Sequence, residues 1–180
     1  MPSSEMSEYL VLTAMGSDRT GCVSELTKLA SACECNIIDS RMAIFGQEFT
    51  FIMLLNGSAK AIYQIETKLP TIAVKLDLIT MMKRTSGYQA QDFTKHYEVS
   101  YAGIDQPGIL KSVTAFFAAR KIDISSLKSE TNPETNQMRA SIHIALTEGT
   151  SIEEIENEFF QLCQLIDVHG TITKADSNLI

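Results

Sequence analysis

An internal duplication is the feature of this sequence that most constrains its fold. When the 180-residue chain is shifted by 87 positions, residues 9–37 lie over residues 96–124 without a gap. Identity between the two copies is low, but the hydrophobic phase is kept and the turn-forming residues coincide. The coincident positions pair Gly16 with Gly103, Asp18 with Asp105, and Gly21 with Gly108. A repeat of this kind indicates two copies of one supersecondary unit.

Each copy has a hydrophobic pattern that predicts the order β-α-β-β-α-β. The first copy is predicted to have strands over 9–15, 36–45, 49–56 and 74–82, with helices over 20–34 and 59–69, the second of them ended by Pro70. The second copy is predicted to have strands from 96, over 122–130 and over 137–147, a helix over 107–120, and a further helix opened by a capping box of Ser151 and Glu154. This order is the ferredoxin-like arrangement. The expected fold class is therefore α+β, with two tandem βαββαβ domains that each carry a four-stranded antiparallel sheet.

The segment between the copies is polar and lacks periodicity, which predicts a linker. We expect one domain over 1–84, the linker over 85–95 and the second domain over 96–180. Exposed sheet edges favour pairing between chains, so we also expect a homo-oligomer.

Composition and charge exclude several classes of function. The formal net charge is −7. A protein that binds nucleic-acid phosphates normally has a basic face, so direct nucleic-acid binding is not expected. No apolar run approaches the roughly 18 residues of a membrane span. The N-terminus also lacks the features of a signal peptide. The sequence therefore predicts a cytoplasmic protein with no membrane partner.

The side chains that could support catalysis or metal binding are dispersed. Cys33 and Cys35 form a C-x-C pair, but no second pair or nearby histidine completes a zinc set. In a reducing compartment the four cysteines are expected to be free thiols that act as small buried hydrophobes. The three histidines lie far apart in the sequence and suggest no pairing of nucleophile and base. We expect no enzyme activity, no metal and no cofactor.

The turn after the first strand is the best candidate for ligand binding. Its four residues are Asp18, Arg19, Thr20 and Gly21. The N-terminus of the helix that follows offers unpaired amides and a partial positive charge, which suit a carboxylate. A glycine there lets the backbone approach a ligand closely. The alternative is that the aspartate only caps the helix, which is worth about 1 kcal/mol.

The next strand begins with an unusual density of polar groups, namely Asn36, Asp39, Ser40 and Arg41. We expect this strand to begin beside the turn, so that the two segments together supply donors and acceptors for a small zwitterion. In the second copy the matching candidates are Asp105, Gln106, Gly108 and Asp123. The alternative for both copies is a capped helix beside an edge strand with solvated polar side chains.

These segments resemble known families at two levels. The D-x-x-G turn before the first helix of each unit resembles ACT domains, small regulatory modules that often sense amino acids. The segments DRTGCVSELT, CNIIDSRMAIFGQEFTFIMLLNGS and LDLITMMKRT are similar to the glycine cleavage system transcriptional repressor family, a pair of ACT domains without a DNA-binding domain. The resemblance covers nearly the whole chain. It is specific from Asp18 to Ser58 and looser in the second copy.

This resemblance implies a regulator of genes for glycine breakdown that contacts a separate DNA-binding activator. By similarity, a small amino acid, expected to be glycine, would bind at the turn over 18–21 and the strand start over 36–41. The family commonly has proline and an aliphatic residue where this chain has Thr20 and Cys22, whereas the second copy has Pro107 and Ile109. The alternative is a generic amino-acid-binding ACT didomain that regulates another protein or an enzyme.

Overall fold

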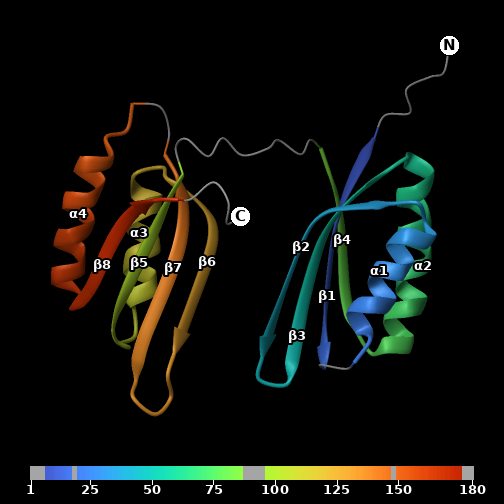
Figure 1. Ribbon diagram of the computed structural model, residues 1–180, viewed down its shortest axis with the longest axis horizontal. Helices are drawn as coiled ribbons and strands as arrows, with labels where there is room; N and C mark the ends of the chain where they lie inside the picture. Colours follow the sequence, from blue (N-terminus) through green and yellow to red (C-terminus); the bar gives the residue numbers. More distant parts are fainter. Residues whose placement is uncertain (1–6, 18–19, 87–95, 147–148, 176–180) are drawn as a thin grey trace. The chain divides into compact units, whose positions relative to one another are not determined.

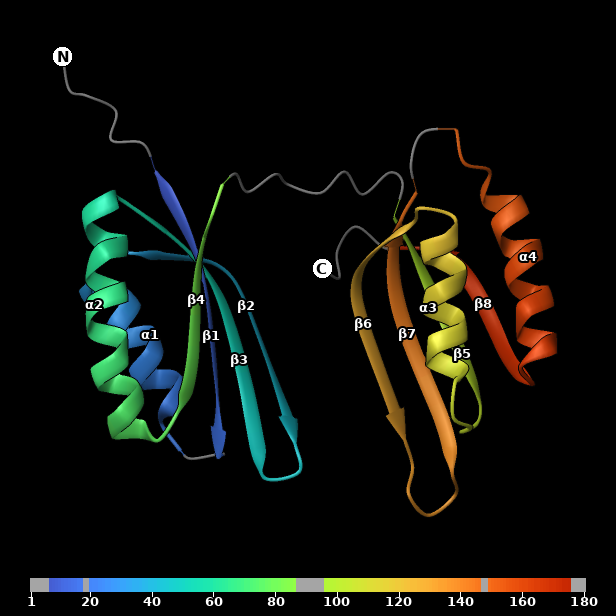
Figure 2. The same ribbon diagram turned by 180° about the vertical axis from the view of Figure 1, so that it is seen from behind.

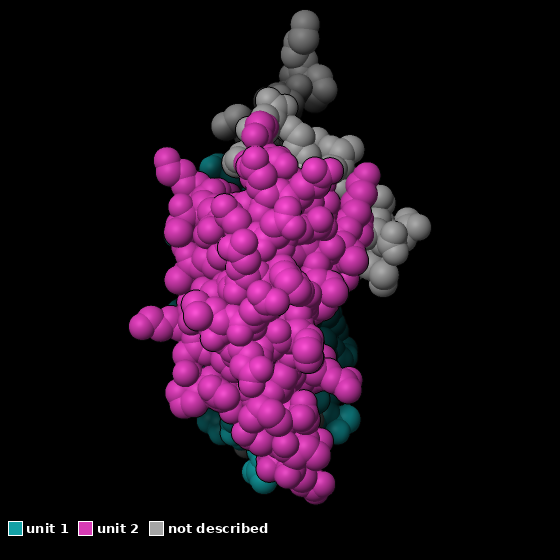
Figure 3. Space-filling model, turned by 90° about the vertical axis from the view of Figure 1, so that its left-hand side faces the viewer, with its two compact units in different colours: residues 1–89 teal, residues 90–180 magenta. Residues whose placement is uncertain are grey.

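The computed structural model describes residues 7–17, 20–86, 96–146 and 149–175. The chain divides into two compact units, residues 1–89 and 90–180, which Figure 3 shows in different colours. Thr85, expected at the start of the linker, is the last residue of a strand. Most of the predicted linker, residues 87–95, lies outside the described residues.

The first unit has the predicted order of strands and helices. Its elements are β1 (Glu8–Ser17), α1 (Cys22–Ala32), β2 (Asn36–Phe45), β3 (Glu48–Gly57), α2 (Ala59–Leu76) and β4 (Ile79–Thr85). The sheet order is β2-β3-β1-β4, and every neighbouring pair is antiparallel. Both helices lie on one side of the sheet, which leaves its other side open (Figures 1 and 2).

The second unit repeats this architecture. Its elements are β5 (His96–Ile104), α3 (Ile109–Ala119), β6 (Asp123–Thr131), β7 (Gln137–Ala145), α4 (Ile152–Leu165) and β8 (Val168–Lys174). The sheet order is β6-β7-β5-β8, again with antiparallel neighbours and with both helices on one side (Figure 1). The predicted fold, two tandem ferredoxin-like units, is therefore confirmed.

The core of each unit lies between the sheet and its helices. Along β1, Leu10, Leu12 and Ala14 are fully buried, while the residues between them are not. The helices supply the facing layer, and Ile62 and Ile65 of α2 are also fully buried. Full burial of such a side chain contributes about 1.5–3 kcal/mol. The alternation of apolar residues in the strands and their helical spacing in α2 thus specify the same core.

The prediction that Pro70 ends the second helix is wrong, because α2 continues to Leu76 with the proline inside it. Proline cannot donate a hydrogen bond to the carbonyl four residues earlier, which normally breaks a helix. Here Leu69 and Ala73 are buried on either side of it, so packing on the sheet keeps the helix together. The predicted strand over 74–82 accordingly begins only at Ile79.

Two of the shared glycines are explained by close backbone approach. A Cβ atom at Gly16 would lie 2.8 Å from Cδ2 of Leu78 and 2.9 Å from the carbonyl oxygen of Asp77. A Cβ atom at Gly103 would lie 3.1 Å from the carbonyl oxygen of Asp167. In both units the end of the first strand thus passes close to the turn that enters the last strand.

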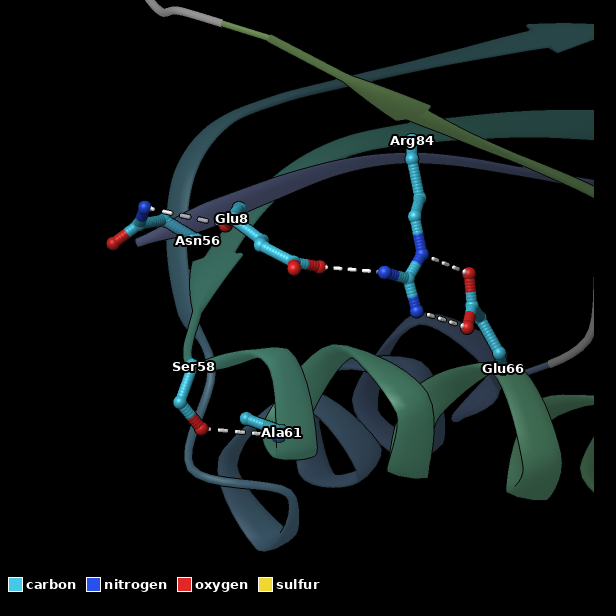
Figure 4. A network of polar contacts seen from close by, with 6 residues as sticks. All are labelled: Glu8, Asn56, Ser58, Ala61, Glu66 and Arg84. Carbon is cyan, nitrogen blue, oxygen red and sulfur yellow. Dashed lines mark hydrogen bonds and ion pairs between the residues drawn. The ribbon is translucent and has the colours of Figure 1, made fainter. Parts of the chain in front are cut away.

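Serine caps begin the second helix of each unit. Ser58 Oγ accepts a hydrogen bond of 3.2 Å from the amide of Ala61 (Figure 4), and Ser151 Oγ accepts one of 3.4 Å from the amide of Glu154. The second of these is the serine half of the predicted capping box. No helix in the described part of the chain combines the length and apolar character that a membrane span needs.

Candidate functional site

The turn before the first helix has the same backbone conformation in both units. Gly21 has a φ of 95° and Gly108 a φ of 99°, which lie in the left-handed region that favours glycine. Each is the residue immediately before its helix. Among the described residues, no side chain accepts a hydrogen bond from the first-turn amides of either helix. These amides are therefore available to an anionic group, except that of Ile109, which donates to the carbonyl oxygen of Gln106 at 3.3 Å.

Asp18 and Arg19, two of the four predicted residues of the first turn, lie outside the described residues. Thr20 is described and is exposed. Cys22, where the family commonly has an aliphatic residue, is buried in the core. The cysteine thus replaces an aliphatic side chain in packing.

In the second unit the turn is tied to a neighbouring hairpin. Asp105 accepts a 3.0 Å hydrogen bond from the Oγ1 of Thr131 at the end of β6. Its amide donates to the carbonyl of Asn136 at 2.9 Å, and its carbonyl accepts from the Asn136 side chain at 3.1 Å. The aspartate therefore links the turn to the β6–β7 hairpin and does not cap α3. Gln106 and Gly108 are exposed beside it.

The expectation that β2 begins beside the turn is wrong. At the turn, Ser17 of β1 pairs with Glu48, and Glu48 pairs with Phe45 at the end of β2. Asn36, at the start of β2, pairs instead with Asn56 at the other end of the sheet. The helix between β1 and β2 carries the chain back, so these two strands run parallel. Asn36 is nine residues from Phe45, about 30 Å along a strand.

The second copy shows the same separation. Asp123 begins β6 and pairs with Ala145, whereas Asp105 is held by Thr131 at the end of that strand. Within one unit, therefore, the two halves of the predicted site do not converge in either copy.

A β-bulge in β2 sets the direction of the polar side chains. The register shifts between Ile37 and Asp39, so one extra residue is inserted. After the bulge Asp39 pairs with Leu54 and Arg41 with Ile52, which places both charged residues on the open side of the sheet. Their side chains form an ion pair with an N–O distance of 3.5 Å. The sequence pattern does not reveal this bulge, which recurs between Ile124 and Ser126.

Strand β2 is an edge strand with an unusually exposed surface. All ten of its residues are exposed, although five of them have large apolar side chains. Met42 is 55%, Ile44 52% and Phe45 70% exposed. An edge strand presents unpaired amides and carbonyls to other chains, and exposed apolar side chains add to the tendency to pair.

A carboxylate–guanidinium network links β1, β4 and α2 at the end of the first sheet opposite the turn. Arg84 of β4 donates from two nitrogens to both carboxylate oxygens of Glu66 on α2, each at 2.8 Å, and at 2.6 Å to Glu8 on β1 (Figure 4). The hydrogen bonds from Arg84 hold the pKa of Glu66 below its ordinary value. The network joins two strands to a helix and has a structural role.

The cysteines also have a structural role. All four are free and buried, and burial raises the pKa of the Cys35 and Cys163 thiols. The described part of the chain contains no group of three or more His, Cys, Asp or Glu residues placed to hold a metal ion. Neither observation supplies a catalytic group.

The fold and the exposed turn define the class of the protein. Residues 8–83 match the ACT domain family. The chain is 40% identical, over 91% of its length and 88% of theirs, to the glycine cleavage system transcriptional repressors of Escherichia coli K12 and Shigella flexneri. The chain belongs to this family of tandem ACT-domain regulators, whose named members are repressors and not enzymes.

Solved structures agree with this assignment. A crystal structure assigned to a glycine cleavage system transcriptional repressor is 40% identical, superimposes with a TM-score of 0.76 and covers 93% of this chain and 97% of that one. A protein of unknown function from Galdieria sulphuraria, 24% identical, superimposes with a TM-score of 0.79 over 94% of this chain and 99% of that one. The second comparison bears on the fold alone.

Proposed function

We propose that the protein represses genes for glycine breakdown in response to a small amino acid, glycine, by contacting a separate DNA-binding activator. The observation that carries this proposal is the identity to named repressors over 91% of the chain. The net charge of −7 supports action through a protein partner, since it disfavours binding to DNA phosphates.

The turn over 18–21 is the proposed half-site for the carboxylate of the effector. The unpaired amides at the start of α1 point out of the helix at this turn, and Arg19 adds a positive charge. The other half-site is the start of β2, where Asn36, Asp39, Ser40 and Arg41 offer acceptors for the ammonium group and further donors. Because these halves lie at opposite ends of β2, one unit alone cannot close the site.

A second copy of the chain would bring the two halves nearer to each other. If β2 pairs in antiparallel fashion with β2 of another copy about a twofold axis, Asn36 of one chain lies beside Phe45 of the other. The separation between the strand start and the turn then falls from about 30 Å along a strand to about 15 Å across three strand spacings. The exposed edge of β2 supports this arrangement.

Substitution on the edge strand tests the pairing. Met42→Glu places a charge on the exposed edge, so we expect both the dimer population and the glycine affinity to fall, as measured by sedimentation and calorimetry. The matched control is Tyr63→Glu, which changes an exposed residue of α2. A variant that binds glycine as the unchanged protein does while remaining monomeric would contradict a site shared between copies.

Partner capture tests the proposed function itself. The tagged full-length protein is incubated with cell extract, with and without glycine, and the retained proteins are identified. We expect a transcriptional activator whose recovery depends on glycine. Recovery of another protein or an enzyme in its place would favour the generic didomain, and recovery of no activator under either condition would overturn the repressor proposal.

DNA binding by the protein alone is the complementary test. A mobility-shift assay with the isolated protein at physiological salt should show no shift, because a net charge of −7 disfavours contacts with DNA phosphates. A shift with the protein alone would refute action through a partner.

A further inference from the structure

The open side of the second sheet contains a pocket that belongs to neither proposed half-site. Its volume is about 380 Å³. All four strands of the sheet contribute to its lining. The lining includes Ser100 and Ala102 of β5, Lys128 of β6, Arg139 of β7, and His169 and Thr171 of β8.

The pocket arises because small side chains on a central strand are flanked by long ones. Ala102 pairs with Arg139 on one side and with His169 on the other. Directly paired residues point to the same side of a sheet, so the guanidinium and the imidazole stand on either side of a methyl group. The alanine thus forms the floor of the pocket, and the two nitrogen-bearing side chains form its walls.

The neighbouring row of the sheet supplies hydroxyl groups. Ser100 pairs with Ser141 and with Thr171, and Ser141 pairs in turn with Lys128. Ser141 already donates a 2.8 Å hydrogen bond to Glu98. The hydroxyls of Ser100 and Thr171 have no hydrogen-bond partner among the described residues. The pocket therefore combines free hydroxyl donors with cationic groups in two adjacent rows.

The cationic side chains of Lys128 and Arg139 are only partly neutralised within the sheet, where Glu130 is the direct cross-strand neighbour of Arg139. Lys128 forms an ion pair of 3.3 Å with Glu130, which also lines the pocket. The side chain of Arg139 has neither an ion pair nor a hydrogen bond among the residues that the structure describes, and the same is true of His169. In a chain with a net charge of −7, this pocket brings together two cationic side chains, one carboxylate and several hydrogen-bond donors.

We propose that this pocket binds a small oxyanion, a phosphate group or a carboxylate. Arg139 presents the planar fork of donors that matches two oxygens of such a group. Lys128 and His169 lie at the sides, and Ser100 and Thr171 donate from the adjacent row. Because every contributor stands on a strand, the sheet fixes the backbone positions of the donors before the anion arrives.

The first unit keeps a cation, Arg41, where the second has Lys128, and a hydroxyl, Thr13, where the second has Ser100, but it lacks the other groups. Where the second sheet has Ala102 between Arg139 and His169, the first has Met15 between Thr50 and Ile79. Where the second has Ser100 between Ser141 and Thr171, the first has Thr13 between Ile52 and Met81. The oxyanion pocket is therefore a property of the second copy alone, and it is independent of the amino-acid site proposed for the first.

The test is a titration of the full-length protein followed by amide NMR signals. Inorganic phosphate and succinate are added in separate series, with chloride at matched ionic strength as the reference. We expect saturable shifts on β5, β7 and β8, and Arg139→Gln should weaken binding by about tenfold. Lys83→Gln, which removes an exposed positive charge from β4 of the first unit, should leave the affinity unchanged.

Each outcome decides the proposal. Saturation by phosphate alone, by succinate alone or by both supports an oxyanion site and identifies the class of oxyanion it accepts. Shifts that do not saturate, or that chloride reproduces, would overturn it. Equal binding by Arg139→Gln and the unchanged protein would also overturn it, because the guanidinium would then have no part in recognition.

Discussion

On the open side of the first sheet, Met15 of the central strand lies between Thr50 and Ile79. At the equivalent place in the second sheet, Ala102 lies between Arg139 and His169. The helix-covered sides show no such divergence, since buried apolar residues alternate along the central strands of both sheets. Duplication has thus kept the side that forms the core and changed the side that the helices leave open.

This difference between the two sheets shows that helix-facing residues and open-side residues are under different packing constraints. Residues that face the helices must fill a close-packed interior, where a change of even one methylene group affects stability. Residues on the open side are free of that requirement, so one copy carries Ile79 and Met81 there and the other carries polar groups. The turn over 18–21 and its counterpart belong to the constrained class, because both need a glycine with positive φ.

The largest expected effect comes from the helix-facing side of the first sheet. Leu12→Ala removes a fully buried side chain and should lower the free energy of unfolding by about 3 kcal/mol. The adjacent Thr13→Ala, on the open side, should change it by no more than about 0.5 kcal/mol. Denaturant unfolding measures both, and equal losses would show that the open side is as constrained as the core.

The close approach at the end of β1 should give the next largest effect. Gly16→Ala should cost about 2 kcal/mol, because the new Cβ atom would lie 2.9 Å from a backbone oxygen. The equivalent Gly103→Ala should cost less, since its nearest backbone oxygen is 3.1 Å away. Unfolding followed by NMR signals assigned to each unit checks the order, and a larger loss for Gly103→Ala would contradict it.

The shared turn should show equal effects in the two copies. Gly21→Ala and Gly108→Ala meet no atom within 4 Å, so only the left-handed backbone opposes them. We expect each to lower the free energy of unfolding by about 1 kcal/mol. Thermal unfolding of the two variants provides the measurement. A loss confined to one copy would mean that the turns are not equivalent.

The smallest effect should come from the Arg84 network and should depend on pH. The pKa of Glu66 is lowered in the folded state, so its contribution is present above the unfolded pKa and is lost as pH falls through the folded value. Glu66→Gln should therefore lower the melting temperature at neutral pH and have less effect at about pH 3.

The second unit supplies the control for that experiment. The side chain of Glu156 on α4 forms no ion pair or hydrogen bond with another described residue, so Glu156→Gln should show no such pH dependence. A difference between the unchanged protein and Glu66→Gln that stays constant over this range would refute the link between the network and the lowered pKa.

Most of the fold could be predicted from periodicity and repetition. The bounds of β2 match the prediction, and the serine before α4 caps it as expected. The second helix of the first unit is longer than predicted, because the rule that proline ends a helix takes no account of the burial of Leu69 and Ala73. The apolar residues after Pro70 fit a strand and a helix equally well, so the sequence could not decide between them.

The candidate site was harder to predict than the fold. The residue types in the turn and in β2 could be selected from the sequence, but their placement depends on strand direction. Helix α1 returns the chain between β1 and β2, so β2 runs parallel to β1, which carries Asn36 away from the turn. The bulge after Ile37 is likewise set by pairing with β3 and has no signature in the sequence of β2 alone.

A complementation experiment tests the shared site most directly. Arg19→Ala damages the turn half and Asn36→Ala damages the strand half, and calorimetry should show that neither variant alone binds glycine. After the two variants are mixed and exchange subunits, about half of the dimers are mixed, and each of these keeps one intact site of two. About a quarter of the wild-type sites should therefore return. If the mixture restores none, the two halves do not come from different copies and the account is contradicted.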